Sequence, residues 1–191
     1  MPIVLNGSGT VTGISVGGLP DGIIQSADLA SGVGGKIVQV VAGTAKTASF
    51  STTSTSDVQV TGLTCQITPT SASNKILVHL QCGSISHSDS NGSATFLKLY
   101  KDGSILSVAV GPSSGNKSRS SFGFRAGGGT GIHTSGSCLC LDSPNTTSQI
   151  EYQVYMNVEQ ATGYMNSTAS NNDHNSNPST FSQIVCMEVA A

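Results

Sequence analysis

The residues that could do acid–base or ligand chemistry in this chain of 191 residues are few: four histidines and ten carboxylates. Catalysis needs an acid, a base or a nucleophile held beside an orienting partner. The Gly-x-Ser-x-Gly match "GPSSG" at 111–115 lies in a stretch rich in glycine and serine, without the strand-to-helix turn that would anchor a serine nucleophile. The glutamates Glu151, Glu159 and Glu188 do not form the close carboxylate pair that a glycosidase needs. We therefore expect a protein without catalytic residues, a cofactor or a metal site.

Two polar stretches, "SHSDSNG" and "NNDHNSN", do bring histidine, aspartate and asparagine together. Such stretches could bind a cation or a sugar hydroxyl, and they are also typical of solvated loop tips at the end of a sandwich. Both interpretations stay open at this point. If the protein recognises a ligand, we expect these residues to contact it first: His87, Asp89, Asn91, Asn172, Asp173, His174 and Asn175.

The five cysteines are an odd number, and all of them fall in apolar stretches that look like strands. No Cys-x-x-Cys pair is present, and the "CLC" pair has no second pair near it in the sequence. The pattern predicts free, buried thiols rather than a disulfide framework or a zinc site. The cysteines are Cys65, Cys82, Cys138, Cys140 and Cys186.

Charge is scarce, since 9% of the residues are charged and the formal net charge is −2. The basic residues are scattered, apart from "NKSRSSFGFR" at 116–125, so the footprint of a nucleic-acid-binding protein is missing. No apolar run approaches 18 residues, and we expect no insertion into a membrane. A net charge near zero promotes association of the protein with other copies or partners.

Alternation of apolar and polar residues dominates from residue 36 onward and predicts about eight antiparallel strands. The stretch "KIVQVV" has apolar residues on both faces, so we expect both to be covered. In 58–67 the apolar parity switches at Thr61 and Gly62, which predicts a β-bulge. We predict an all-β fold, a jelly-roll-like antiparallel β-sandwich, rather than an immunoglobulin-like one, because the chain has no tryptophan.

The clearest local element is "TFLKLYKDGSILSVAV", in which Asp102 and Gly103 suit the positive-φ positions of a type I′ hairpin turn. This register places Leu99 opposite Leu106 and Leu97 opposite Val108. The second face of the hairpin is too apolar for plain solvent surface and too polar for a core.

Several strands with two apolar faces imply burial beyond one sandwich core. A cyclic homo-oligomer would supply that burial, and we expect a trimer. The residues that we expect at the interface are Phe96, Tyr100, Ile105, Ile184 and Cys186.

The N-terminal segment, residues 1–35, differs from the β-domain at 36–191. "GLPDG" predicts a turn, and "SADLASG" predicts a one-turn helix that begins after Ser26 and ends at Gly32. So short a helix needs a partner surface, and we interpret the extended segment as an anchor and hinge. The residues expected to make the anchor are Leu19, Pro20, Ile23, Ile24 and Leu29.

The stretches "LNGSGTVTGISVGGLPDG", "ADLASGVGGKIVQVV" and the terminal "VCMEVAA" together resemble tail-fibre-like virion structural proteins of tailed bacteriophages, especially marine ones. The resemblance covers nearly the whole chain. It implies a non-enzymatic, homotrimeric fibre, assembled in the host cytoplasm and located in the virion, with an N-terminal anchor and a distal β-domain for host attachment. The implied partners are other copies of the chain, virion proteins such as a tail adaptor, hub or capsid, and a glycan or protein of the bacterial surface.

Two further functions remain as alternatives at this stage. A head fibre or capsid decoration protein would use the same construction on the phage shell. A polysaccharide depolymerase would instead cleave host glycans.

Overall fold

A computed structural model describes residues 36–89, 92–125, 132–170, 172–175 and 177–191. The predicted anchor and helix in 1–35, and Asn91, lie outside the described residues. Ile37–Ala191 form one compact unit, and helix within its described part is limited to the 3-10 turn η2 (Ser107–Ala109).

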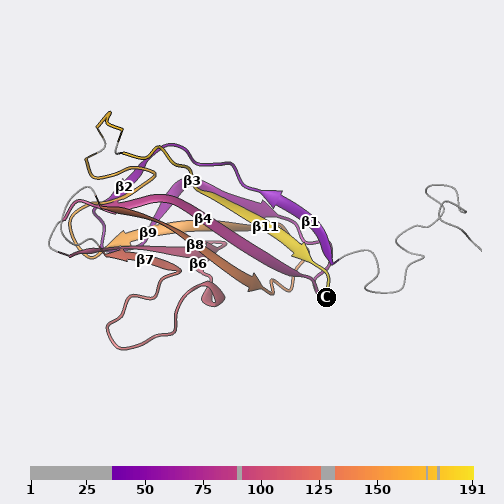
Figure 1. Cartoon of the computed structure of the whole chain (residues 1–191). Helices are drawn as coiled ribbons and strands as arrows, with labels where there is room; N and C mark the ends of the chain where they lie inside the picture. Colours follow the sequence, from indigo (N-terminus) through magenta and orange to yellow (C-terminus); the bar gives the residue numbers. More distant parts are fainter. Residues whose placement is uncertain (1–35, 90–91, 126–131, 171, 176) are drawn as a thin grey trace, which may run out of the picture. The chain divides into compact units, whose positions relative to one another are not determined.

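The described residues form eleven strands arranged in two sheets, all paired antiparallel (Figure 1). The strands are β1 (Ile37–Ala42), β2 (Phe50–Thr52), β3 (Val58–Ile67), β4 (Lys75–His87), β5 (Ala94–Lys101), β6 (Ser104–Ile105), β7 (Phe122–Arg125), β8 (His133–Asp142), β9 (Ile150–Val158), β10 (Gly163–Met165) and β11 (Gln183–Val189).

The first sheet has the order β1–β11–β4–β10–β2, with β8 on β4. Because β8 pairs with nearly the full length of β4, β11 and β10 must share the opposite edge of β4, one after the other. The second sheet has the order β3–β9–β5–β6, with β7 on β5. The predicted all-β, antiparallel sandwich is confirmed, whereas the jelly-roll detail stays a prediction.

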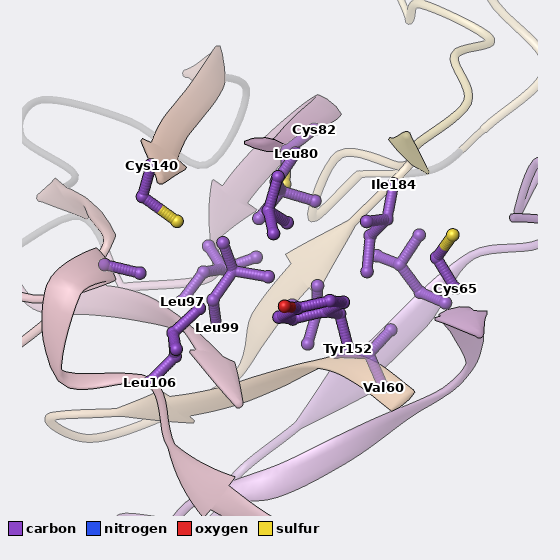
Figure 2. Packing of buried hydrophobic residues seen from close by; sticks show 14 of the residues in the cluster. Val60, Cys65, Leu80, Cys82, Leu97, Leu99, Leu106, Cys140, Tyr152 and Ile184 are labelled. Atoms are coloured by element: carbon purple, nitrogen blue, oxygen red, sulfur yellow. The ribbon is translucent and has the colours of Figure 1, made fainter. Parts of the chain in front are cut away.

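The core lies between the inner faces of the two sheets, where side chains point toward one another (Figure 2). Leu80 and Ile184 come from the first sheet and Tyr152 from the second, and each is 0% exposed. Burial of one such large apolar side chain stabilises the fold by roughly 1.5–3 kcal/mol. The hydroxyl of Tyr152 donates a hydrogen bond of 2.8 Å to Asp142 Oδ2, so the polar end of this core residue is satisfied.

The predicted hairpin turn is confirmed, since Asp102 and Gly103 have φ values of +48° and +75°. The N–H of Leu106 donates to the carbonyl of Leu99 at 3.0 Å, as the predicted register requires. The β-bulge predicted at Thr61 and Gly62 in β3 is also confirmed. Gly62 has a φ of +80°, and the pairing of β3 with β9 is irregular between Gln59 and Thr64.

Two predictions about strand faces are wrong. The hairpin ends at Ile105 and the chain turns into η2, so Leu97 pairs with Phe122 instead of Val108, which is 56% exposed. In β1 one face is uncovered, because Val40 is 58% exposed. The second face of this edge strand lies outside the sandwich, and among the described residues no element covers it.

The chain enters and leaves the sandwich at the same end. Ile37 at the start of β1 pairs with Val189 at the end of β11, and Val189 pairs with Lys75 at the start of β4. The 13 residues of β4 then carry the chain to His87, about 40 Å away at roughly 3.3 Å per residue. His87 thus marks the end of the sandwich that is distal to Ile37.

Candidate functional site

His87 was predicted to face a ligand from a loop, and this prediction is wrong. The residue ends β4 and is 0% exposed. The N–H of Asp89 donates to His87 Nδ1 at 3.0 Å, and His87 Nε2 therefore donates to the carbonyl of Gln160 at 2.7 Å. The imidazole is a buried cross-link between two loops, so it offers no face to a ligand.

The carboxylate of Asp89 closes the same loop pair. It accepts hydrogen bonds at Oδ2 from Ser93 Oγ at 2.9 Å and from Gln160 Nε2 at 2.6 Å. This arrangement explains the polar composition of the stretch by loop closure, without a bound cation.

The second polar loop is also held together by hydrogen bonds between its own residues. The carbonyl of Asn172 accepts from the N–H of His174 and from Asn177 Nδ2, each at 2.9 Å, and Thr168 Oγ1 donates to Asn177 Oδ1 at 2.9 Å. The exposed residues of this loop are Asn172, Asp173, His174 and Asn175, and contact with a ligand there stays a prediction. Within the part of the chain that the structure describes, no three His, Cys, Asp or Glu side chains are grouped to hold a metal ion.

Three of the five expected interface residues must be corrected. Ile184 and Cys186 are each 0% exposed inside the core, because β11 lies between β1 and β4 and turns these side chains inward. Tyr100 is 9% exposed, because its ring stacks on Tyr155 of the same sheet. Phe96 and Ile105 also lie on the second sheet, where Ile105 is 40% exposed and Phe96 is half-buried, and for these two residues the interface stays a prediction.

A hollow of about 680 Å³ opens on the outer face of the second sheet, over β5, β7 and β9. The hollow forms because Ala94 and Gly123 have side chains too small to fill the space above the sheet. The ring of Phe96 leans over Gly123, so close that a Cβ there would lie 3.3 Å from Phe96 Cδ1. The hollow is lined by Thr55, Ala94, Phe96, Asn116, Lys117, Ser118, Gly123, Phe124, Arg125, Asn157, Val158 and Glu159.

Groups of opposite charge line this hollow together with aromatic rings. Lys117, Arg125 and Glu159 are exposed, and the Arg125 Nε–H donates to the carbonyl of Gly92. The volume lies in the range of small-ligand sites, whereas the hollow is more open and its lining more polar than is usual for them.

Asn157 lies beside Phe96 in this hollow and is 8% exposed. Its Nδ2 donates to the carbonyl of Thr55 at 3.1 Å, which fixes the amide orientation. Among the described residues, its Oδ1 has no hydrogen-bond partner. A buried acceptor that lacks a hydrogen-bond donor destabilises the folded state, so the unpaired oxygen of Asn157 is an uncommon feature in a folded protein.

Beyond Phe96, the outer face of β5 continues as a polar and aromatic cluster around Asp57. The carboxylate accepts from Lys98 Nζ at 2.6 Å and from the hydroxyl of Tyr100 at 2.5 Å. The rings of Tyr100 and Tyr155 stack with centroids 3.9 Å apart. Burial and the neighbouring Asp57 raise the pKa of Tyr100, which keeps the phenol protonated as a donor. The cluster therefore makes one wall beside the hollow rigid.

Glu188 lies in β11, where its carboxylate is buried instead of solvated as strand glutamates usually are. The residue is 0% exposed. Its Oε1 accepts from Thr70 N at 2.7 Å, Thr70 Oγ1 at 2.8 Å and Asn74 Nδ2 at 2.7 Å, and its Oε2 accepts from Gln39 Nε2 at 2.5 Å. This carboxylate joins β1, β11 and the β3–β4 loop, so its role is structural. Sequence patterns carry no signal for it, since its donors lie over a hundred residues away.

The cysteines are free, as predicted, and all except the half-buried Cys138 are buried. Among the described residues, no helix is long and apolar enough to span a bilayer. No protein-family model matches the chain, and no curated protein matches it. The fold and the hollow thus define an antiparallel β-sandwich with a site of small-ligand size on one outer face.

Proposed function

We propose that this chain is a non-enzymatic structural fibre protein of a bacteriophage virion, assembled as a homotrimer, whose β-sandwich attaches to a glycan of the bacterial surface. The observation that carries the proposal is that the hollow opens near the end of the sandwich distal to Ile37. A domain held at one end needs its recognition site near the other. The resemblance of the chain to phage fibre proteins supports the same function.

The distal position of the hollow follows from its strands. Ala94 begins β5 only a short loop after β4 ends at His87, and Thr95 Oγ1 donates to the carbonyl of Ser86 at 3.5 Å. The N–H of Glu159 donates to the carbonyl of Ala94 at 2.9 Å, so the end of β9 lies there as well. Both termini of the sandwich lie at the opposite end.

The lining of the hollow fits an acidic saccharide. The ring of Phe96 offers an apolar platform for the face of a pyranose, and the amides of Asn116 and Asn157 suit hydroxyl groups. Lys117 and Arg125 supply positive charge for a carboxylate or phosphate on the sugar. The single carboxylate of the lining, Glu159, leaves the hollow with a net positive charge.

Binding of the purified full-length chain to host cells tests this proposal. We expect Lys117→Gln and Phe96→Ala each to weaken binding at least tenfold, because one removes a charge and the other the platform. Lys75→Gln is the matched control, since Lys75 is exposed at the other end of the sandwich. Equal binding by all three variants and the wild type would refute recognition at the hollow.

Antibody labelling of intact particles tests the location on the virion. Label on the tail supports the fibre, and label on the shell indicates the alternative head fibre or capsid decoration protein. Release of reducing ends from host glycans would instead indicate a depolymerase and contradict the non-enzymatic assignment. Deletion of residues 1–35 should leave a folded β-domain that no longer joins the particle, and normal incorporation of that variant would overturn the anchor.

A further inference from the structure

The outer face of the first sheet carries an apolar row that crosses four of its six strands. Val40 of β1 pairs with Met187 of β11, Met187 pairs with Leu77 of β4, and Leu77 pairs with Leu141 of β8. Figure 1 shows β11 between β1 and β4. At the two ends of the row, Val40 is 58% and Leu141 45% exposed.

A second row runs beside the first, two residues further along each strand. Ala42 pairs with Val185, Val185 with His79, and His79 with Leu139, which is 64% exposed. Residues two apart on a strand lie on the same face, so the two rows form one continuous surface. Neither row contains a lysine, arginine, aspartate or glutamate.

Polar residues border the two rows on one side. The next row along the strands consists of Gln183, Gln81 and Ser137. On the other side, the next row consists of Ile37, Val189 and Lys75, so the apolar surface continues to Ile37 at one end and meets a charge at Lys75. An apolar centre with a polar rim is the usual anatomy of a protein interface.

The size of this face together with its rim suits association. Four strands about 4.8 Å apart and the roughly four residues that the two rows span along each strand, at about 3.3 Å each, give an apolar centre of roughly 250 Å². With the rows on either side included, the seven residues of β11 extend the face to roughly 440 Å², before the relief of the side chains is counted. That is over half of the roughly 800 Å² that each partner contributes to a standard interface.

We propose that this face, formed by the rows that start at Val40 and Ala42, is the surface through which copies of this chain associate. A second copy is the occupant that the charge pattern favours, because the rows have no charged group to select a different partner by complementary charge. The formal net charge of −2 gives little repulsion between copies. The number of copies in this inference rests on the proposed homotrimer. The location of the face is argued independently, from the strand registers and the exposed fractions of its residues.

Light scattering on the full-length chain tests the proposal. Three copies of 19.3 kDa have a mass of about 58 kDa, which we expect for the wild type. The double variant Leu139→Lys and Leu141→Lys should show a threefold lower mass, because it places like charges on every copy's face. The control with the same added charge is Ser107→Lys with Val108→Lys, at exposed positions outside the face, and it should keep the wild-type mass.

Circular dichroism and cooperative thermal unfolding check that each variant folds. If the double variant does not fold, Val40→Lys changes the same face from its opposite edge, and it should lower the mass equally. A folded face variant that keeps the wild-type mass overturns the proposed surface while the homotrimer stands. A monomeric wild type overturns both, and binding to host cells separately decides whether the hollow recognises the bacterial surface.

Discussion

The buried carboxylate of Glu188 makes the stability of the sandwich depend on acid. Burial raises the pKa of this carboxyl, but the hydrogen bonds from Asn74, Gln39 and Thr70 outweigh burial and lower the pKa to about 2. The ordinary value is 4.5. The difference corresponds to about 3 kcal/mol of the free energy of unfolding, at about 1.4 kcal/mol per pKa unit.

The direction of the pH effect follows from the lowered pKa of Glu188. The folded state holds the charged form more tightly than the unfolded chain does, so the stabilisation is fully present above pH 4.5. It is lost as the pH falls through this value toward 2. Urea unfolding followed by circular dichroism at several pH values between 7 and 2 measures this loss.

Glu188→Gln removes the charge and supplies a donor where Gln39, Thr70 and Asn74 already donate. We expect this variant to be less stable than the wild type by about 2–4 kcal/mol at pH 7, since buried donors lose a charged acceptor. Its stability should also change less between pH 5 and pH 2. Glu159→Gln is the control, since Glu159 is exposed and should leave both quantities unchanged. A Glu188→Gln protein with the wild-type pH dependence would refute the reasoning.

Two further predictions concern the bulge and the thiols. Gly62→Ala should lower the free energy of unfolding in urea by about 1 kcal/mol, because its φ of +80° disfavours a side chain, whereas Gly111→Ala, at an open position, should not. Equal stability of the two variants would contradict this. The neighbouring Cys140 thiol lowers the pKa of Cys138, which is also the half-buried cysteine, so iodoacetamide at pH 7.5 should modify this thiol first, and mass spectrometry of Cys138→Ser should show that adduct lost. First modification at a buried cysteine would argue against this order.

Strands with regular alternation could be predicted from the sequence. The stretch 150–158 alternates strictly, and the structure forms β9 from Ile150 to Val158 with the apolar set in the core. The turn at Asp102 and Gly103 and the bulge at Gly62 were also predictable, because few residue types suit a positive φ.

The second half of β4 could not be predicted in this way, because it places serines where apolar residues would be expected. Ser84 and Ser86 are buried, and both hydroxyls donate to the carbonyl of Ser167. A distant loop satisfies them, and no local pattern indicates such a partner. The same composition conceals β10 at Gly163–Met165, which is too short for alternation to show.

The sequence analysis did not predict the hollow, because its floor is formed by the small residues Ala94 and Gly123, which carry no chemical signal of a binding site. Of the predicted ligand-binding residues that the structure describes, none lines it, and Phe96 had been assigned to an interface. The one available signal was the basic stretch 116–125, which supplies Lys117 and Arg125. Only the pairing of β5 with β7 and β9 brings this stretch to Asn157.

The pairing of Ile37 with Val189 decides how the domain would carry a mechanical load. If the chain is held at Lys36 and the distal end is pulled, the force acts along β1 and loads its hydrogen bonds to β11 together, in shear. A pull between Lys36 and Ala191 would instead open the same pair one bond at a time. The sandwich should therefore resist tension toward its distal end far better than tension between its own termini.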